Sequence, residues 1–478
     1  MIEVLKPYPA YKDSGVEWLG QVPEHWEVRR LKTAVDHINE QTSTKSDEDL
    51  YIALEHVESW TGRLLVSSGE AQFDSQVKRF RVGDVLFGKL RPYLAKVVRP
   101  KQSGVCVGEF FVLRARPVVA PHYLEVVLRS APAIDFVNNS TYGAKMPRAD
   151  WTFVGAMLFP LPPLPEQTAI VRFLDYVDRR IRRVMRARQR RIKLLEEYKQ
   201  ALIHRAVTGQ IDVRTGEPYP AYKDSGVEWL GQVPAHWEVV PLKRLAWFKS
   251  GAGFPVHHQG DMNAEIPFFK VSDMNIPGNE KYLRICPNTV SMTVARSLGA
   301  TVFPAGTIIF PKVGGALLTN KRRIAESHCC IDNNMMGCVA RNGDRDFLFL
   351  IMSCIDLGTI AKLGPVPAIS EGEVREIRVA LPSAPEQTAI VEYLDAQTTK
   401  IDAAIATARR EIELLREYRT RLIADVVTGK VDVREVAAQL PEKSPKEGEW
   451  TDMEETVGGE AVDNGAAAET FSEEEVER

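Results

Sequence analysis

Apolar residues recur every three or four positions along two stretches of the chain, a spacing that predicts two long amphipathic helices. The first stretch runs from Pro165 to Val207, and the second lies 220 residues further along. At 1.5 Å per residue, each helix should be on the order of 60 Å long. Counted in sevens, the stripe comprises Leu174, Ile181, Arg188, Leu195 and Leu202 in the first stretch and Leu394, Ile401, Ala408, Leu415 and Leu422 in the second; the positions between them are Ile170, Val177, Val184, Arg191 and Tyr198, and Ile390, Gln397, Ala404, Glu411 and Tyr418.

Helices of this length cannot bury their stripes inside one small domain, so the sequence favours pairing of the two helices with each other. The heptad spacing is typical of a coiled coil, and we expect an antiparallel pair. Arg188 and Arg191 would then lie in the middle of the seam, where Glu411 supplies an opposite charge. In the alternative arrangement, each helix packs on its own globular domain.

A second pattern is an internal repeat near the start of each half of the chain. Residues 8–23 read YPAYKDSGVEWLGQVP, and residues 219–234 read the same letter for letter. The match continues through HWEV at residues 25–28 and 236–239. The offset is 211 residues here and 220 at the helices, so the second half has gained nine residues in between. The chain is therefore predicted to be two tandem units with fixed ends and different middles.

The middles, residues 29–164 and 240–384, hold short apolar or alternating runs bounded by turn residues, which is typical of α+β domains. We expect strands near residues 81–97, 109–113, 266–271 and 307–312, and short helices at Pro121–Leu128 and Asp346–Cys354. The predicted fold class is α+β, with two globular α/β-type domains separated by two long helices that form an antiparallel coiled coil. The expected boundaries are 1–164 for the first domain, 165–213 for the first helix and linker, 214–384 for the second domain, 385–434 for the second helix, and 435–478 for a disordered acidic tail.

Net charge changes this picture once it is divided along the chain. The whole chain carries −3, but residues 435–478 hold 14 acidic and three basic residues, so the other 434 residues carry +8. A positive body favours a polyanionic partner. The tail is rich in Glu, Gly and Ala and poor in large apolar residues, a composition typical of disorder.

Cysteine usage and hydropathy indicate a reduced, cytoplasmic protein. The six cysteines show no C-x-x-C spacing and no accompanying histidine framework, so we expect neither a zinc site nor a disulfide scaffold. The first residues lack the apolar core of a signal peptide. The longest apolar run, Phe347–Ile355, is too short to cross a membrane.

Catalytic signatures are missing from the sequence. It contains no phosphate-binding G-x-x-x-x-G-K-[ST] loop, no H-E-x-x-H, no G-x-S-x-G and no strand-borne G-x-G-x-x-G. The short Gly251-Ala252-Gly253 segment is expected to be a tight turn. His25 and His236, beside the repeated tryptophans, are expected to be packed and hydrogen-bonded histidines. We therefore predict no catalytic residue, no metal and no cofactor on this chain.

Cationic residues beside predicted turns are the chemistry that the middles do offer. Such residues bind phosphates, while Arg, Asn, Ser and Thr can also contact base edges. The alternative is a solvated charged surface without a partner. The first helix adds 12 basic against five acidic residues between Glu166 and Arg205, so its exposed side could lie along DNA or hold an acidic partner. The candidate DNA-binding residues are Lys89, Arg91, Lys96, Lys145, Arg148, Lys270, Lys312, Lys321, Arg322 and Arg323.

This organisation closely resembles the DNA-specificity subunits of Type I restriction-modification systems. The resemblance covers nearly the whole chain to about Val433. It depends on YKDSGVEWLG, on GKLRPYLAK at residues 88–96, on SGAGFP at 250–255, on PAGT at 304–307, on PEQTAIV at the start of each helix, and on VTG-x-(I/V)-DV after each helix. The acidic tail is not part of the family pattern.

Membership of that family would imply that each middle is a target recognition domain that reads one half of a bipartite site in double-stranded DNA. It would also imply that the helices form a spacer and dock two methyltransferase subunits, which restriction/translocase subunits join. S-adenosylmethionine, ATP and Mg would be bound by those partners, and no membrane would be involved. Residues expected to pair the helices or dock subunits are Leu174, Ile181, Leu195, Tyr198, Leu202, Leu394, Ile401, Leu415, Tyr418 and Leu422.

Two other classes of protein are considered. A coiled-coil scaffold without DNA recognition fits the helices but leaves the cationic turns unexplained. A self-sufficient DNA-modifying enzyme would require a cofactor or metal constellation, and the sequence contains no motif for one.

Overall fold

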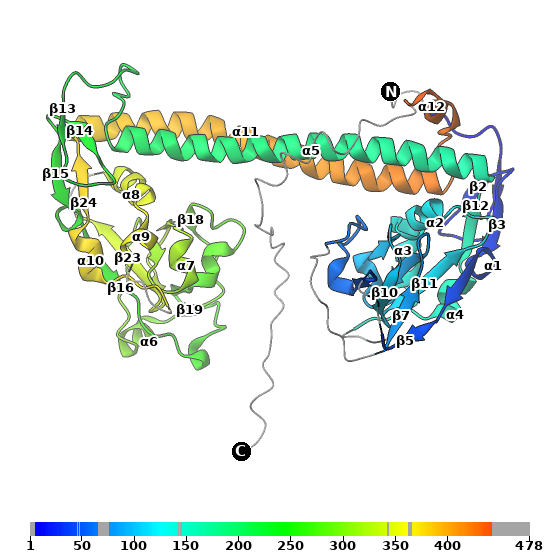
Figure 1. Cartoon of the computed structure of the whole chain (residues 1–478). Coiled ribbons are helices and arrows are strands. Elements are labelled where there is room, and N and C mark those ends of the chain that lie inside the picture. The colour runs from blue at the N-terminus through cyan, green and yellow to red at the C-terminus, as the bar shows by residue number, and fades with distance from the viewer. Residues whose placement is uncertain are drawn as a thin grey trace. The chain divides into compact units, whose positions relative to one another are not determined.

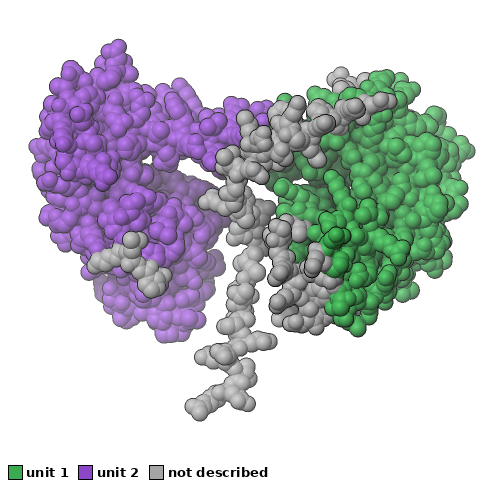
Figure 2. Space-filling model, viewed as in Figure 1, with its two compact units in different colours: residues 1–186, 413–478 green, residues 187–412 purple. Residues whose placement is uncertain are grey.

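A computed structural model shows two compact units, which Figure 2 colours separately. Unit 1 comprises residues 1–186 and 413–478, and unit 2 comprises residues 187–412. The structure describes residues 5–441 except 45, 47, 66–75, 142, 144–145, 342–343 and 362–365. All statements below concern these described residues.

Unit 1 is built on two four-stranded sheets with helices packed against them (Figure 1). The strand orders are β4-β11-β8-β9 and β5-β7-β10-β6, and two two-stranded sheets, β1-β2 and β12-β3, accompany them. The strands are β1 (Tyr11–Asp13), β2 (Gln21–Pro23), β3 (Glu27–Arg30), β4 (Val35–Ile38), β5 (Gln41–Thr42), β6 (Leu50–Ile52), β7 (Val77–Phe80), β8 (Val85–Gly88), β9 (Val97–Val98), β10 (Gly104–Val107), β11 (Phe110–Ala115) and β12 (Leu158–Leu161). The helices are α1 (Leu31–Ala34), η2 (Leu54–His56), η3 (Pro92–Leu94), α2 (Pro121–Leu128), α3 (Ala131–Asn138), α4 (Trp151–Ala156) and α12 (Arg434–Gln439).

Unit 2 contains a five-stranded sheet, β16-β23-β20-β21-β18, and a three-stranded sheet, β19-β17-β22. The pairs β13-β14 and β15-β24 match β1-β2 and β3-β12 of unit 1. The strands are β13 (Tyr222–Asp224), β14 (Gln232–Pro234), β15 (Glu238–Pro241), β16 (Ala246–Ser250), β17 (Ile266–Phe269), β18 (Tyr282–Leu283), β19 (Thr289–Val290), β20 (Ile308–Pro311), β21 (Arg323–Ala325), β22 (Cys330–Ile331), β23 (Met335–Ala340) and β24 (Arg378–Leu381). The helices are η4 (Leu242–Arg244), η5 (Val256–His258), η6 (Val271–Asn275), α6 (Met292–Ser297), α7 (Gly315–Leu318), α8 (Arg345–Cys354), α9 (Leu357–Ile360) and α10 (Glu371–Glu376).

The predicted α+β fold class with an antiparallel helix pair is confirmed. The predicted helix Pro121–Leu128 is α2, and the helix predicted at Asp346–Cys354 is α8, which begins one residue earlier. The run at residues 89–97 is not a strand. It is a turn that contains η3, and only its last residue, Val97, pairs with β8 through β9.

The two long helices are α5 (Leu164–Val207) and α11 (Ala384–Val427), and each unit contains one part of both. In unit 1, Ile170 and Leu174 of α5 share a core with Leu422 and Val426 of α11. In unit 2, the core joins the last turns of α5, including Leu202, to the first turns of α11. The start of one helix therefore packs against the end of the other in each unit.

Ion pairs across the helices of unit 2 show the same antiparallel direction. Arg188 pairs with Glu411 at 2.5 Å, Glu196 with Arg409 at 2.9 Å, and Lys199 with Asp402 at 2.7 Å. Because the residue numbers rise along α5 while they fall along α11, the helices run in opposite directions. The contact between Arg188 and Glu411 is the mid-seam pair that the sequence predicts.

Half of the predicted seam is displaced by one residue. Ile181, Leu202, Leu394, Ile401 and Leu422 are buried as expected, and Leu174 is only 5% exposed. In the predicted seam, each intermediate position follows a heptad position by three residues. In the structure it follows by four residues, so Ile405, Ile412 and Val426 are buried. The predicted pairing residue Tyr198 is instead 58% exposed, Val184 is 42% exposed, and Arg191 is exposed.

The displacement has a physical cause. In α5 the intermediate seam positions include Asp178 and Lys199. These residues are charged, so a count of apolar residues does not detect their positions. Both side chains are satisfied by ion pairs across the seam, because Asp178 contacts Arg419 and Lys199 contacts Asp402. Leu195, Leu415 and Tyr418 are half-buried at the edge of the seam.

The segment after α11 differs from the expected tail. Residues 434–439 form α12, and Val436 and Ala437 are buried in the core of unit 1. The predicted disordered segment therefore cannot begin at residue 435. The remainder, residues 442–478, lies outside the described residues, so its predicted disorder stays a prediction.

Candidate nucleic-acid interface

In unit 1 the turn after β8 is held on a frame of backbone hydrogen bonds. The N–H of Lys89 donates to the carbonyl of Glu109 at 2.9 Å, and the Lys89 carbonyl accepts from Ala149 at 2.8 Å. The N–H of Arg91 donates to the Pro147 carbonyl at 2.7 Å, and Leu90 forms a β-bridge with Arg148. This frame brings three predicted cations, Lys89, Arg91 and Arg148, to one turn.

Unit 2 repeats this frame with different residues. The N–H of Lys312, which follows β20, donates to the Asn334 carbonyl at 2.8 Å, and the Lys312 carbonyl accepts from Ile369 at 2.9 Å. The N–H of Gly314 donates to Pro367 at 2.8 Å, and Val313 forms a β-bridge with Ala368. Lys312 is therefore the structural equivalent of Lys89.

The cations of the unit 1 turn differ in how firmly they are held. Arg91 is exposed and adopts a left-handed backbone conformation with φ of 50°. Arg148 donates to Glu109 at 3.0 Å. Burial of His37, followed by the positive charges of Lys78 and Lys89, lowers the pKa of the His37 imidazole. The turn is therefore an electropositive region that contains one well-exposed guanidinium.

In unit 2 the equivalent lysine is part of a polar network. Lys312 Nζ donates to Ser250 Oγ at 2.9 Å, and the Ser250 N–H donates to Glu371 at 2.7 Å. Burial would raise the pKa of the Glu371 carboxyl, but the hydrogen bonds from Ser250 and the charges of Lys249 and Lys312 bring it below its ordinary value. Glu371 therefore stays ionised and fixes the backbone beside Lys312. Ser250 and Glu371 were not predicted as site residues.

The glycine segment beside this network is not the predicted tight turn, because Ala252 forms a parallel β-bridge with Asp332. The Gly251 N–H donates to the Met335 carbonyl, and Ala252 donates to the Ile331 carbonyl. A Cβ atom on Gly251 would lie 2.1 Å from the carbonyl oxygen of Asp332. The close approach of two backbones explains the glycine without a cofactor.

Two further predicted cations of unit 2 are half-buried and held by neutral partners. Lys270 Nζ donates to Gln259 at 3.0 Å, and Lys321 Nζ donates to Asn275 at 2.5 Å. Neither side chain has an ion-pair partner among those the structure describes. Both therefore keep positive charge that a phosphate could neutralise.

One predicted DNA contact, Arg322, is instead a structural residue, and two others, Arg323 and Lys96, are half-buried and donate to backbone carbonyls. Arg322 is 5% exposed and donates to the carbonyls of Met352 and Ile355 at the end of α8. Its burial lowers the pKa of the guanidinium to about 10. Arg323 donates to the carbonyls of Arg322 and Met274, and Lys96 donates to that of Leu54 at 2.7 Å.

The burial of Arg322 has a simple cause: a cation beside a turn can satisfy backbone carbonyls as readily as phosphates. Burial also lowers the pKa of the Lys96 ammonium. Lys145 lies outside the described residues, so its assignment is not tested.

The repeated segment forms a second site, a junction at the start of α5. Glu166, only 5% exposed, accepts hydrogen bonds from Tyr8 at 2.6 Å and from the indole of Trp26 at 2.9 Å. His25 Nε2 lies 2.8 Å from the other carboxylate oxygen. The ring of Tyr8 also lies 5.1 Å from the guanidinium of Arg434. The glutamate of PEQ thus ties together the repeat, α5 and the segment after α11.

The junction of unit 2 has the same parts with looser distances. Glu386 lies 2.9 Å from His236 Nε2 and accepts from the Trp237 indole at 3.4 Å. Arg214 contacts both Asp212, at 2.7 Å, and Glu386, at 3.5 Å. The predicted hydrogen bonds of His25 and His236 are confirmed by these contacts. The expectation that both histidines are packed is wrong, because their side chains are 41% and 55% exposed.

Exposed apolar residues remain on the charged helices. In unit 2, Leu194 is 64% exposed and lies one turn from Tyr198 on α5. In unit 1, Leu414 of α11 is 47% exposed. Tyr198 therefore does not pair the helices, although its exposure is compatible with the predicted docking role.

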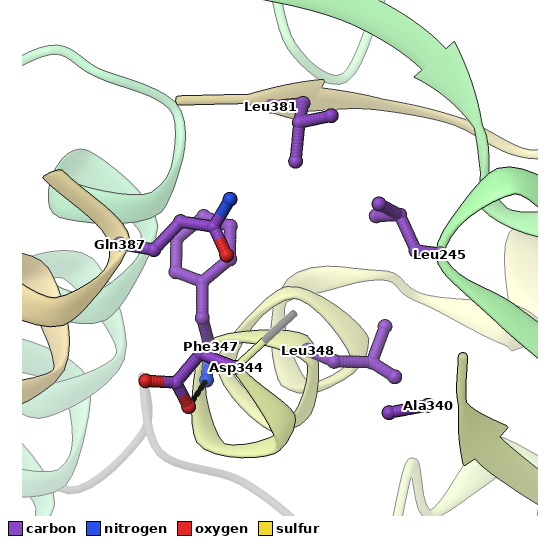
Figure 3. Close-up of a pocket in the computed structure, with 7 residues that line it drawn as sticks. All are labelled: Leu245, Ala340, Asp344, Phe347, Leu348, Leu381 and Gln387. Carbon is purple, nitrogen blue, oxygen red and sulfur yellow. Dashed lines mark hydrogen bonds between the residues drawn. The ribbon is translucent and has the colours of Figure 1, made fainter. Parts of the chain in front are cut away.

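Figure 3 shows a pocket in unit 2 between the strands and α8. Leu245, Ala340, Phe347 and Leu348 contribute apolar side chains, and Gln387 of α11 lies at its edge. The space holds little more than one water molecule. This pocket is too small for a nucleotide or methyl-donor cofactor.

The described residues contain no group of three or more His, Cys, Asp or Glu side chains that could hold a metal ion. Nor do they contain a helix that is long and apolar enough to span a membrane.

The fold defines a class of protein: two related α/β units that share a pair of antiparallel helices, with a cationic turn on the same backbone frame in each. No protein-family model matches the sequence. Curated relatives nevertheless resemble it, two of them over most of their length. A Methanocaldococcus jannaschii protein provisionally named the type I restriction enzyme MjaX specificity subunit is 24% identical, and the match covers 87% of this chain and 96% of the relative.

Two other relatives agree. The type I restriction enzyme MjaVIII specificity subunit of the same organism is 22% identical over 87% of this chain and 95% of its own length. The Escherichia coli EcoDI specificity subunit is 26% identical over 35% of this chain and 39% of its own.

A solved structure supports the fold. A chain from a study of complex assembly and conformational transition in the type I R-M system is 21% identical with a TM-score of 0.65, and the match covers 85% of this chain and 98% of that one. The chain therefore resembles Type I specificity subunits in sequence, which confirms the predicted resemblance, and its fold is similar to that of a chain from a type I R-M system.

Proposed function

We propose that this chain is the non-catalytic specificity subunit of a Type I restriction-modification complex. Each unit would bind one half of a bipartite target in double-stranded DNA. The observation that carries this proposal is the matched pair of turns, because Lys89 and Lys312 occupy the same backbone frame in domains whose other residues differ. A shared cation can position the phosphate backbone, while the unlike residues around it provide different base contacts.

The fixed junctions support the remainder of the proposal. Glu166 and Glu386 hold the same repeated residues against the start of α5 and α11, so both units present the same surface to a partner. Two copies of one methyltransferase subunit would fit two such surfaces, and restriction/translocase subunits would join them. S-adenosylmethionine, ATP and Mg would be bound by those partners.

The strand pairs that bound each domain define where one domain can be exchanged to test the proposal. We call the strand pairs β3-β12 of unit 1 and β15-β24 of unit 2 the necks. The first neck ends where the Leu31 N–H donates to the Met157 carbonyl. The second ends where the Leu242 N–H donates to the Ile377 carbonyl. Replacing residues 31–157 with the matching part of a related protein leaves both neck strands intact. The methylated motif of cells that express this chimaera and a methyltransferase subunit should change in one half only. A motif that changes in both halves, or in neither, contradicts the proposal.

Point variants test the turns themselves. Lys89→Gln and Lys312→Gln, each in the assembled methyltransferase complex, should lower the slope of log affinity against log salt by about one, since each removes one phosphate contact. Lys12→Gln and Lys223→Gln are matched controls, because these exposed lysines occupy equivalent places in β1 and β13. Equal effects of the turn and control variants would show that only general charge matters.

A further inference from the structure

A tight hairpin turn joins β22 to β23 in unit 2, and a buried aspartate holds it in place. The carboxylate of Asp332 accepts from the Asn334 N–H at 2.8 Å and from the Val271 N–H at 3.3 Å. The Asp332 N–H donates to the Phe269 carbonyl at 3.0 Å, so the turn is also attached to the end of β17. Because its backbone is bonded to both neighbouring segments, this turn presents its side chains from a fixed position.

The two residues at the tip of the turn are asparagines, Asn333 and Asn334, and both are exposed. No hydrogen bond of either side-chain amide is recorded among the residues that the structure describes. Neither residue is in the left-handed region of backbone conformation, in which asparagine is favoured for its own sake. The turn therefore does not need two amides for its own structure.

Two lysines lie beside this turn. The Lys312 N–H donates to the Asn334 carbonyl at 2.8 Å, which places the turn after β20 directly beside the hairpin. Lys270 adjoins Val271, whose N–H is bonded to Asp332. Since both lysines can bind phosphates, a duplex held by them would bring a groove edge to the tip of the hairpin.

The same turn in unit 1 has different chemistry. The Lys89 N–H donates to the Glu109 carbonyl at 2.9 Å, so Glu109 occupies the place of Asn334, and a glycine precedes it. The Glu109 carboxylate is already paired with Arg148 at 3.0 Å. The lysine of the frame is therefore common to both units, whereas the hairpin beside it is not. Such a difference is expected of residues that distinguish two half-sites.

An amide has the chemistry to read a base. It offers a donor and an acceptor, whereas a phosphate oxygen only accepts and carries no sequence information. Adenine presents an N7 acceptor and an N6 donor in the major groove, and asparagine can bind both together. We propose that Asn333 and Asn334 read adenine in the half-site bound by unit 2, between phosphate contacts made by Lys270 and Lys312. This inference rests on the proposed function and names the residues that give one unit its specificity.

Binding selection with the assembled methyltransferase complex tests this assignment. The half of the motif that is unchanged in the chimaera of residues 31–157 is the half bound by unit 2, and duplexes with that half randomised are the probe. Asn333→Ala and Asn334→Ala should each lower the preference for adenine at one position by about fivefold or more. Gln232→Ala is the matched control, because it removes an exposed amide from β14, and it should select the same sequences as the parent.

Two further measurements separate a base contact from other roles. The alanine variants should keep the parent's slope of log affinity against log salt, whereas Lys312→Gln should lower it by about one. Asn334→Asp keeps an acceptor and loses the donor. Preference at its position should therefore shift from adenine towards cytosine, whose N4 amino group is a donor. Thermal unfolding equal to that of the parent checks the fold of each variant.

Failure of this inference can be told apart from failure of the proposed function. Alanine variants that keep the adenine preference, or that lower the salt slope, overturn the inference alone, because the amides would then be idle or bound to phosphate. A half-site of unit 2 without an A·T pair does the same. A wild-type complex that binds every sequence equally overturns the proposed function and the inference together.

Discussion

Arg91 occupies a backbone position at which its side chain is costly. Its φ of 50° and ψ of 63° are left-handed, and the equivalent residue in unit 2, Gly314, also has a positive φ, of 73°. A non-glycine residue in the left-handed region costs roughly 1–2 kcal/mol. No hydrogen bond or ion pair of the Arg91 side chain is recorded among the described residues, so the guanidinium does not recover that cost within the chain.

Arg91→Gly should therefore have opposite effects on stability and on DNA binding. Relief of the left-handed strain gains about 1–2 kcal/mol, while the extra freedom of glycine in the unfolded chain costs about 0.5–1 kcal/mol. The stability of unit 1 should be unchanged or rise by up to about 1.5 kcal/mol. The DNA complex should lose about one unit of salt slope, because one phosphate contact is removed.

Hydrogen exchange measured by mass spectrometry provides the stability readout. Peptides of unit 1 report the change, and those of unit 2 serve as an internal control. Asn320→Gly is the matched variant, because Asn320 also has a φ of 50° but accepts hydrogen bonds from Arg322 and Leu357. That variant should be destabilised by the loss of its amide. A loss of more than 1 kcal/mol in Arg91→Gly, or an unchanged salt slope, would refute the reasoning.

Three further predictions concern the junctions. Glu166→Ala should destabilise unit 1 by about 3–5 kcal/mol in urea unfolding, because it leaves two buried donors, including the Trp26 indole, without an acceptor; Glu166→Gln keeps the accepting oxygen and should cost about 1 kcal/mol or less. Gly429→Ala places a Cβ 2.3 Å from Pro23 and should cost clearly more than Gly20→Ala, which has a similar positive φ and open space; equal thermal shifts would contradict this. The side-chain hydrogen bond from Arg214 lowers the pKa of the Asp212 carboxyl below its ordinary 3.8. The stabilisation that ionised Asp212 gives unit 2 is therefore present above pH 3.8 and is lost as the pH falls through the lowered pKa. Asp212→Asn should make the unfolding free energy of unit 2 less dependent on pH in this acid range.

The long helices could be predicted because their pattern is repeated and extended. Both begin within one residue of the predicted start and end at Val207 and Val427, before a glycine with positive φ. The exact seam could not be read from apolar residues alone. Asp178 and Lys199 occupy seam positions and are neutralised by residues more than 200 positions away, a pairing that only the folded chain reveals.

At the candidate interface, the sequence predicts which cations lie beside turns but not which of them are exposed. Lys89 and Lys312 each follow an apolar run beside a predicted turn, and the structure places them on equivalent backbone frames. The same pattern predicts a DNA contact at Arg322, whose guanidinium instead binds the carbonyl end of α8. Local sequence does not distinguish these outcomes, because which helix end lies above a turn is decided by long-range packing.

The contrast between fixed junctions and variable turns explains how one architecture can accept different middles. Each middle enters through one neck strand and leaves through the other, with Leu31 bonded to Met157 in unit 1 and Leu242 to Ile377 in unit 2. On the helix side of those bonds, a buried carboxylate, Glu166 or Glu386, holds the histidine and tryptophan of the repeat. Residues beyond the neck can therefore change without disturbing the junction, so selection can alter what a turn contacts while the surface near the helices stays constant.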